Sequence, residues 1–311
     1  MRRTTTFLTG LLALPLLAGC RGGGDAGEGL SGMIQTDGSS TVFPVTQAMA
    51  EEFQIANSGV RVTVGVSGTG GGFEKFCNGE TAISNASRPI RDSERERCAA
   101  NGIEPIELTV AWDGLTVVVN PENDWATCMT VDELRRVWQP GSTIRRWSEI
   151  RDGWPDQPIE LYGPDTDSGT FDYFTESIVG EAEASRADYT ASADDNVLVL
   201  GVSGDGGALG YFGYAYYEQN EDKLKALEID GGNGCVAPTR VTVEDQSYTP
   251  LSRPLFIYVR PDALERPEVR AFLEFYIENG EALVPETGYV PLNAADYDAQ
   301  LAKLPATSGG S

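Results

Sequence analysis

The sequence predicts an α/β protein of two lobes, each built around a mainly parallel sheet flanked by helices. With 311 residues, of which 41% are hydrophobic, the chain is large enough for two domains with buried cores. Short β-rich runs alternate with amphipathic segments, which is the pattern of repeated βαβ units. A long β-branched run at 107–122 is suited to cross from one lobe to the other.

The first half of the chain reads as a βαβαβ unit. In chain order we expect a strand at 33–38, a helix at 43–57, a strand at 60–68, a helix from 71 and a strand at 81–87. Strands joined through helices pair in parallel, so their carboxyl ends should meet at one edge of the sheet.

The second half contains a further α/β set. We expect a helix at 130–139, a strand and loop at 158–169, a helix at 170–180, two strands around a glycine-rich stretch within 196–217, a strand at 252–261 and a helical segment at 267–288.

The amino terminus has the pattern of an export signal. A basic start is followed by an apolar run from Phe7 to Ala18 that is too short for a lasting transmembrane span. The sequence Leu-Ala-Gly-Cys at 17–20 resembles the bacterial lipoprotein box, in which the cysteine, here Cys20, is lipidated; the alternative is an ordinary signal with a chance cysteine. We expect a signal peptide at 1–19 and a flexible glycine-rich tether at 20–32.

Charge and composition exclude several functions. The formal net charge is −24, so nucleic acid is not expected as a partner, and any bound anion must be held by short-range donors. The sequence has no histidine, which removes histidine-dependent nucleophile arrangements and the usual zinc sites. Neither a metal nor another cofactor is expected.

Four cysteines remain after Cys20, in a chain that the signal directs out of the cytoplasm. An even number there favours two disulfides. Three pairings are possible, and we favour Cys77 with Cys98 and Cys128 with Cys235, because the first pair closes a short local loop.

Three loops rich in glycine, serine and threonine stand between a predicted strand and a predicted helix: DGSSTVFP at 37–44, GVSGTGGGF at 65–73 and GPDTDSGTF at 163–171. The start of a helix has unpaired N–H groups and a partial positive charge, and it therefore receives an anion well. Helix capping by Ser and Thr is the ordinary explanation for one such loop, but three loops together favour an oxyanion site. The glycine patterns fit neither a P-loop nor a nucleophile elbow.

A fourth segment, SNASRPI at 84–90, could add a positive charge. Arg88 follows the carboxyl end of a predicted strand, where ligands of open α/β sheets usually bind, and could bond two oxyanion oxygens. The alternative is a surface arginine paired with Asp92 or Glu94.

These segments, in this order, together with GALGYFGYAYY at 207–217, resemble the phosphate-binding lipoproteins of ABC import systems over residues 33–295. The resemblance implies the two-lobed periplasmic binding-protein fold of type II, with phosphate in the cleft between the lobes. With this fold we expect lobe 1 at 33–120 and 240–303, lobe 2 at 121–239 and a disordered tail at 304–311.

Matching the family motifs to this sequence implies a set of phosphate ligands: Ser40, Thr41, Val42, Ser67, Thr69, Gly70, Ser87, Ser168, Gly169 and Thr170. The sequence departs from the family at two points. Pro164 stands where members have an arginine, so Arg88 is our candidate for the cation. Arg88 also stands about where members have the aspartate that accepts the phosphate proton. The possible substitutes for that aspartate are Asp37, Asp165 and Asp167.

We therefore expect an exported, lipid-anchored monomer at the outer face of the membrane. It would bind inorganic phosphate with high affinity, pass it to an ABC permease and catalyse no reaction. The alternatives are a binder of another tetrahedral oxyanion, a phosphate-sensing surface module and, less favoured, a secreted phosphatase.

Overall fold

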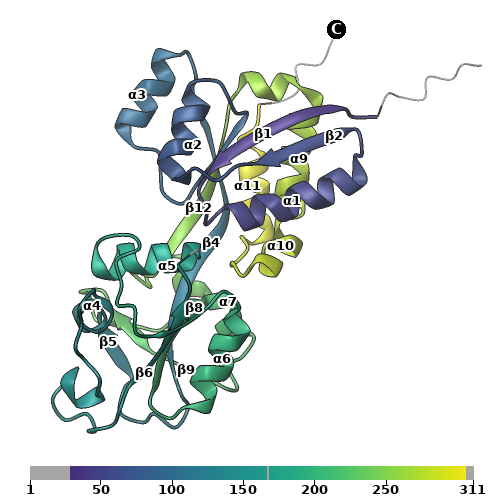
Figure 1. Cartoon of the computed structure of the whole chain (residues 1–311). Coiled ribbons are helices and arrows are strands. Elements are labelled where there is room, and N and C mark those ends of the chain that lie inside the picture. Colours follow the sequence, from purple (N-terminus) through teal and green to yellow (C-terminus); the bar gives the residue numbers. More distant parts are fainter. Residues whose placement is uncertain (1–28, 167, 306–311) are drawn as a thin grey trace, which may run out of the picture.

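The computed structural model describes residues 29–166 and 168–305, and it has the predicted two lobes (Figure 1). Two strands, β4 (Ile106–Val119) and β12 (Ser252–Val259), run through the connection between the lobes. The two-lobed α/β class is confirmed. The expected signal peptide, Cys20 and the last six residues of the chain lie outside the described residues.

Lobe 1 contains a five-stranded sheet in the order β2-β1-β3-β12-β4. Strand β1 is parallel to β2 and β3, whereas β12 is antiparallel to β3 and β4. Its other strands are β1 (Gly32–Gly38), β2 (Val60–Val64) and β3 (Ile83–Ala86). Its helices are α1 (Phe43–Ala56), α2 (Gly68–Cys77), α3 (Asp92–Ala100), η3 (Asp262–Glu265), α9 (Pro267–Glu278), α10 (Gly280–Leu283), η4 (Pro285–Thr287) and α11 (Ala294–Leu301).

Helices cover both faces of this sheet, and the alternation of side chains along β12 shows how. Leu255, Ile257 and Val259 belong to the core beneath α1 and α9. The intervening Phe256 and Tyr258 pack on the opposite face against α2. Successive strand residues point to opposite faces, so an apolar run such as this one can serve two cores.

Lobe 2 continues the same sheet through β4, followed by β8, β6 and β7. Strand β6 is parallel to β7 and β8, and β8 is antiparallel to β4. The strands of the lobe are β5 (Cys128–Thr130), β6 (Glu160–Pro164), β7 (Thr190–Ser192), β8 (Ala208–Gly213), β9 (Lys225–Ala226), β10 (Glu228–Asp230) and β11 (Cys235–Val236). Its helices are α4 (Val131–Trp138), η1 (Trp147–Glu149), α5 (Gly169–Phe174), the π-helical turn η2 (Thr175–Val179), α6 (Asp195–Gly204), α7 (Tyr214–Glu218) and α8 (Arg240–Glu244).

The long run predicted to cross between the lobes does so as β4. Its first part, to Gly114, pairs with β12, and its second part, from Leu115, pairs with β8. The expected lobe boundaries at 120 and 240 need correction, because lobe 2 begins within β4 and extends to the start of β12. Tyr248 and Leu251 are buried in the lobe 2 core. Leu304, expected in the tail, packs on the core of lobe 1.

One element was predicted wrongly. The apolar run that begins at Asn196 was expected to be a strand, but it forms helix α6. Asp194 caps this helix by accepting a hydrogen bond from the amide of Asn196 at 3.0 Å. The buried residues Leu198, Val199 and Val202 have helical spacing. Helix α6 connects β7 to β8, and both of these strands pair in parallel with β6. Leu200 is exposed, and its presence hides the period in the sequence.

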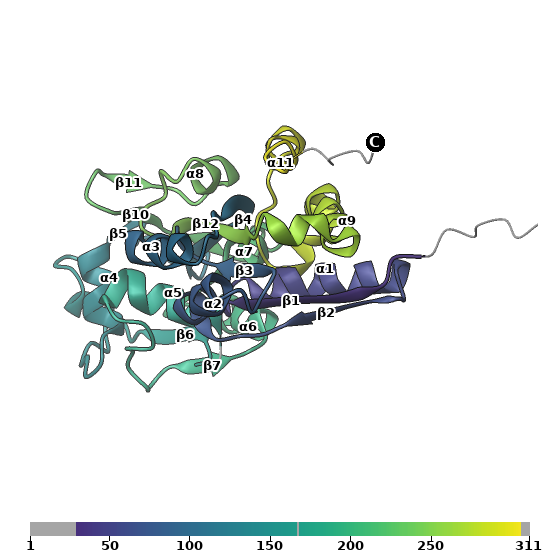
Figure 2. The same ribbon diagram turned by 90° about the horizontal axis from the view of Figure 1, so that it is seen from above.

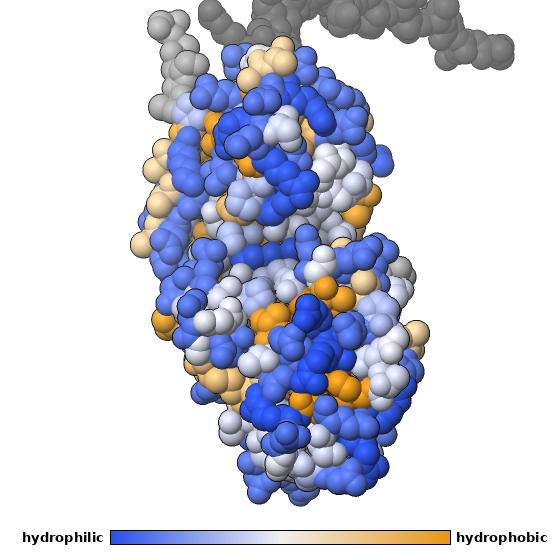
Figure 3. Space-filling view, turned by 90° about the vertical axis from the view of Figure 1, so that its left-hand side faces the viewer, coloured by the Kyte–Doolittle hydropathy of each residue, from blue (hydrophilic) through white to orange (hydrophobic). Residues whose placement is uncertain are grey.

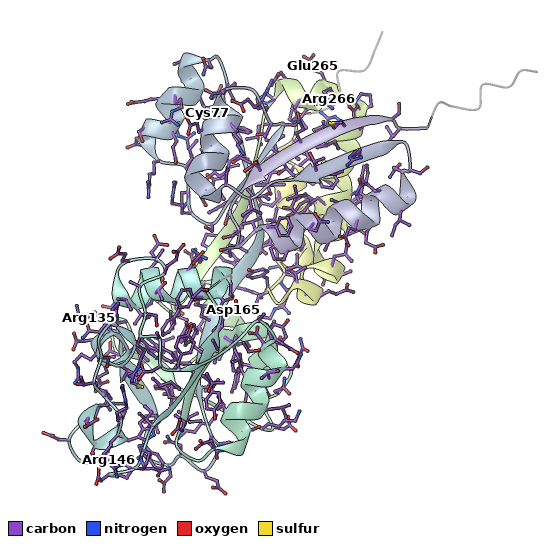
Figure 4. All side chains as sticks on the ribbon, in the orientation of Figure 1. Cys77, Arg135, Arg146, Asp165, Glu265 and Arg266 are labelled. Carbon is purple, nitrogen blue, oxygen red and sulfur yellow. A yellow bond between two sulfur atoms is a disulfide. The ribbon has the colours of Figure 1, made fainter. Side chains whose placement is uncertain are left out.

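Two disulfides link the four cysteines as favoured from the sequence. Cys77, labelled in Figure 4, is bonded to Cys98 and joins α2 to α3. Cys128 is bonded to Cys235 and joins the two outer strands of the small sheet β11-β10-β5.

Seen from the side in Figure 3, most of the surface is hydrophilic. No helix in the described part of the chain has the length and apolar character to span a bilayer.

Candidate functional site

The three loops singled out in the sequence follow the carboxyl ends of β1, β2 and β6 and lead into α1, α2 and α5. Because β1 and β2 are parallel neighbours, the first two loops lie at the same edge of the lobe 1 sheet. The third loop is carried by lobe 2. Figure 4 labels Asp165, a residue of this third loop, close to the junction of the lobes.

The first loop, 39–42, presents backbone amides at the start of α1. The amide of Phe43 donates to the carbonyl of Ser39 at 3.1 Å and closes the first helical turn. Within the described parts of the chain, the amides of Thr41 and Val42 donate to no protein acceptor. They are the unpaired N–H donors of a helix start. Pro44, in the first turn of α1, has no backbone N–H and therefore leaves no further donor unpaired.

The second loop is tied both to the first loop and to the end of β3. Ser67 donates through its hydroxyl to Asp37 at 2.5 Å, and its amide donates to the carbonyl of Gly38. The hydroxyls of Thr69 and Ser87 lie 3.2 Å apart. Gly70 belongs to the first turn of α2. Among the predicted ligands of lobe 1, Thr69 and Ser87 are therefore in contact, and Ser67 is bonded to Asp37 and Gly38 at the start of the first loop.

The third loop meets the first loop across the cleft. Ser168 caps α5, and its hydroxyl accepts a hydrogen bond from the amide of Thr170 at 3.2 Å. At Gly169 the two lobes are in close contact, since a Cβ atom there would lie 2.9 Å from Oγ1 of Thr41. Only glycine allows this approach.

A cleft of about 540 Å³ lies between the first and third loops, and Val66 lines it from the second loop. The predicted ligands that do not line it are Thr41, Val42, Ser67, Thr69, Gly70 and Ser87. Ser40 and Phe43 line it from lobe 1, and Ser168 and Thr170 line it from lobe 2. The remaining lining residues are Pro44, Asp165, Gly169, Ala193, Asp195, Gly213, Tyr216, Thr287, Gly288 and Tyr289.

The cation at this junction is Arg253, on β12, which the sequence analysis missed. Its guanidinium donates to Oγ1 of Thr41 at 3.2 Å and to a carboxylate oxygen of Asp113 at 3.1 Å. It also covers the ring of Tyr173, with 3.5 Å between the guanidinium carbon and the ring centroid. A residue of each lobe thus contacts the same arginine.

Asp113, on β4, pairs with Arg253 in the interior. Its side chain is only 2% exposed. Burial raises the pKa of Asp113, and the charge and hydrogen bond of Arg253 oppose that rise. One feature of the sequence could have pointed to this pair, since Asp113 and Arg253 are charged residues in otherwise apolar strand runs. A charge in such a run needs a partner of opposite charge.

Arg88, our candidate for the cation, is engaged elsewhere. Its two terminal nitrogens donate to the two carboxylate oxygens of Glu94, each at 2.8 Å. This bidentate geometry occupies the planar fork that would have bound an oxyanion. The structure therefore corrects our assignment, and the alternative pairing with Glu94 is the one found.

The acidic candidates are placed differently from one another. Asp37 forms an ion pair with Lys75 at 2.6 Å. Burial alone would raise the pKa of Asp37, but the hydrogen bonds from Lys75 and Ser67 lower it below its usual value. Asp165 lines the cleft, and Asp167 lies outside the described residues.

One group of possible metal ligands occurs among the described residues: Cys128, Glu228 and Cys235. Two of its three members are joined in a disulfide, so they have no thiolate to offer a metal.

Comparison with known proteins identifies several relatives. Residues 23–279 match the model of the PBP superfamily domain. Protein SphX of Synechocystis is 50% identical over 268 residues, which cover 85% of this chain and 80% of SphX. The phosphate-binding protein PstS of Staphylococcus saprophyticus is 39% identical over 310 residues, covering 98% of this chain and 95% of PstS.

Solved structures of similar proteins agree with this relationship. A possible phosphate binding protein from Planctomyces limnophilus superimposes with a TM-score of 0.85 at 52% identity, covering 88% of this chain and 98% of that protein. A phosphate transport receptor from Vibrio cholerae, at 23% identity and a TM-score of 0.67, shares the fold.

Proposed function

The chain belongs to the PBP superfamily and, within it, to the family of PstS and SphX, and from this we propose that it binds inorganic phosphate and delivers it to an ABC permease. The single observation that carries the proposal is the meeting of the two lobes at one arginine, Arg253, which contacts Thr41 of the first loop and Tyr173 of helix α5. Thr41 also touches Gly169, and the first and third loops both begin helices.

In this proposal the ion lies between the three loops. The amides of Thr41 and Val42 and the hydroxyl of Ser40 donate from the first loop. Thr69, Gly70 and Ser87 donate from the rest of lobe 1, and Ser168, Gly169 and Thr170 donate from lobe 2. Ser67, whose hydroxyl and amide donate to Asp37 and Gly38, holds the second loop in place. Backbone N–H groups at helix starts favour negative charge without a formal cation, which suits a chain with a net charge of −24.

Arg253 replaces Arg88 as the cation of the site. The guanidinium group of Arg253 donates a hydrogen bond to Thr41, and its contacts with Asp113 and with the ring of Tyr173 fix the orientation of the group. An arginine fixed in advance loses less freedom when an oxyanion arrives. Because Asp113 balances its charge in the absence of phosphate, the empty cleft does not bury an unpaired cation.

Binding and release would be coupled to movement of the lobes. The connection consists of β4 and β12, and Asp113 and Arg253 lie on these two strands at the crossing. A phosphate held by loops of both lobes would favour the closed arrangement, and opening would release it at the permease.

The remaining parts of the proposal concern the place and mode of action. The basic start, apolar run and Cys20 support export and lipid anchoring at the outer face of the membrane. The protein acts as a monomer and as a carrier without catalysis, so it should release no product from a chromogenic phosphate ester.

Calorimetric titration of the ligand-stripped mature chain with phosphate, arsenate and sulfate tests the proposal. We expect one phosphate per chain and similar binding of arsenate, which has the same shape and protonation. Sulfate, which carries no proton at neutral pH, should bind much more weakly. No heat of binding with phosphate, or equal affinity for sulfate, would refute a phosphate carrier.

A further inference from the structure

Asn85 is a polar residue in the interior of lobe 1. It lies in β3, two residues before Ser87, and it is fully buried. Its Oδ1 atom accepts a hydrogen bond at 2.9 Å from the hydroxyl of Thr46, a buried residue of α1. The Thr46 hydroxyl also lies 3.0 Å from the hydroxyl of Tyr276 on α9. These three side chains form a polar group beside the apolar core of the lobe.

Stability alone would not favour an asparagine at this position. In the part of the chain that the structure describes, Nδ2 of Asn85 has no hydrogen-bond partner. A buried N–H group without a partner costs free energy, and an aliphatic side chain would avoid that cost. Such costs are typical of positions where function and stability compete, so the contacts of Asn85 with the neighbouring loops need to be considered.

The side chain of Asn85 holds the first turn of α1. The amide of Thr46 donates to the carbonyl of Val42 at 3.1 Å, so the turn that contains Val42 is fixed to Asn85 through Thr46. In the view of Figure 2, α1 extends along β1, the strand that leads into it. The bond between Thr46 and Asn85 adds a second attachment of this helix start, to β3.

The backbone of Asn85 holds the beginning of the first loop. Its carbonyl accepts a hydrogen bond from the amide of Ser39 at 3.0 Å. At Gly38, where φ is +141°, a Cβ atom would lie 2.2 Å from the same carbonyl oxygen. Only glycine allows the loop to pass this close to β3.

The end of β3 also contacts the second loop. The amide of Ser87 donates to the hydroxyl of Thr69 at 3.3 Å, and the two hydroxyls lie 3.2 Å apart. The segment from Asn85 to Ser87 therefore touches both the start of α1 and the second loop. Donors that come from separate parts of the chain are aligned with one strand end.

We propose that Asn85 is a positioning residue, which fixes the amides at the start of α1 relative to Ser87 and Thr69 so that all of them meet one oxyanion. This inference rests on the proposed function of the loops as a phosphate site. Asn85 is fully buried and is not itself a ligand. Without its bond to Thr46, the helix start occupies additional positions, and the affinity falls with the fraction of molecules that have the binding geometry.

Calorimetric titration of ligand-stripped variants of the mature chain with phosphate tests the proposal. Thr46→Val keeps the shape of the side chain but removes its hydroxyl, and it should weaken phosphate binding about 2- to 10-fold, as expected for loss of one hydrogen bond. Thr46→Ser, which keeps a hydroxyl, should bind more tightly than Thr46→Val. Because Asn85 acts through Thr46, Asn85→Leu/Thr46→Val should bind no more weakly than Asn85→Leu alone.

The control is a second buried asparagine, Asn120 in lobe 2. Its side-chain amide donates to the carbonyls of Val202 and Ser203 at 3.1 and 2.8 Å. Asn120→Ala should lower the melting temperature, because it leaves these carbonyls unpaired, but it should bind phosphate like the wild type. Asn85→Leu/Thr46→Val replaces both partners of its hydrogen bond by apolar side chains, so it should lose affinity with a smaller loss of stability.

The outcomes separate this inference from the proposed function. If the wild type does not bind phosphate, both fail. If the wild type binds phosphate and Thr46→Val and Asn85→Leu bind it equally well, Asn85 has no positioning role while the phosphate site stands. A loss of affinity in Asn120→Ala as large as in Thr46→Val would also overturn the inference, because destabilisation alone would then explain the effect.

Discussion

At the scale of single residues, the candidate site combines features that differ in how visible they are in the sequence. The loop donors could be predicted because serine, threonine and glycine between a strand and a helix carry their signal locally. Arg253 could not, because it is 212 residues from Thr41 and meets it only through the pairing of β12 with its neighbours. Arg88 was chosen because it follows the carboxyl end of a predicted strand, and the sequence alone did not decide between an oxyanion and Glu94 as its partner.

Replacing Arg253 tests its assignment as the cation. Arg253→Ala should weaken phosphate binding by about 10- to 150-fold, equivalent to roughly 1.5–3 kcal/mol for a charge-assisted hydrogen bond. Arg253→Lys should recover part of the affinity, because an ammonium group keeps the charge but lacks the planar fork. Titration calorimetry measures both values.

Arg88→Ala is the matched control, and it should change phosphate affinity little. Because Arg253→Ala leaves Asp113 buried without its partner, the fold of each variant must be verified by circular dichroism. Wild-type affinity in Arg253→Ala, or a large loss in Arg88→Ala, would reverse the assignment.

At the scale of elements, most of the chain was predictable from its pattern, and helix α6 shows where the pattern misleads. Its exposed face carries Val197 and Leu200, so the run appears uniformly apolar and resembles a buried strand. What decides for a helix is that β7 and β8 both pair in parallel with β6, so the segment between them must cross over the sheet. This pairing is a property of the folded sheet and cannot be read from the segment itself. By contrast, α4 has polar and apolar faces and a complete capping box, and it was predicted correctly.

The capping box of α4 gives a pH-dependent prediction. Burial alone would raise the pKa of Glu133, but hydrogen bonds from Arg151 and from Thr130 lower it. A lowered pKa means that this carboxylate stabilises the fold above the unfolded value of about 4.3, and that the contribution is lost as pH falls through the native pKa.

Glu133→Gln should therefore cost about 1 kcal/mol of unfolding free energy at pH 7 and less near pH 3. Urea denaturation at both pH values measures this, with Glu104→Gln, an exposed carboxylate, as the control. An equal cost at both pH values would show that the charge of Glu133 has no part in the stabilisation.

The disulfide between α2 and α3 can be tested separately from the ligand. Peptide mapping should find Cys77 bonded to Cys98, and a Cys77→Ser/Cys98→Ser variant should lose about 2–5 kcal/mol of stability. Finding Cys77 bonded to Cys128 would refute the pairing. The second disulfide, in lobe 2, should remain intact in this variant.

At the scale of the whole molecule, the two lobes share one continuous sheet, and this explains the error in the predicted boundaries. The expected boundaries at 120 and 240 came with the fold that the resemblance implies, and β4, which is buried in both lobes, gives no change of pattern at Gly114 that would have corrected them. A ligand that is bonded to both lobes should therefore stabilise the whole fold and not one lobe alone.

Phosphate should accordingly raise the stability of the protein as a whole. Mass action predicts roughly 4 kcal/mol at about 1,000 times the dissociation constant. Differential scanning calorimetry with phosphate and with equal concentrations of sulfate should show a much larger shift for phosphate. Identical shifts would indicate a general oxyanion binder.

The central claim, that phosphate binds between the loops of the two lobes beside Arg253, is tested most directly by a crystal structure of the protein with phosphate. We predict a tetrahedral ion in contact with the amides at Thr41 and Val42, with Ser168 and Thr170, and with the guanidinium of Arg253, while Arg88 stays paired with Glu94. An ion bound elsewhere, or one held by Arg88 with Arg253 uninvolved, would contradict the account.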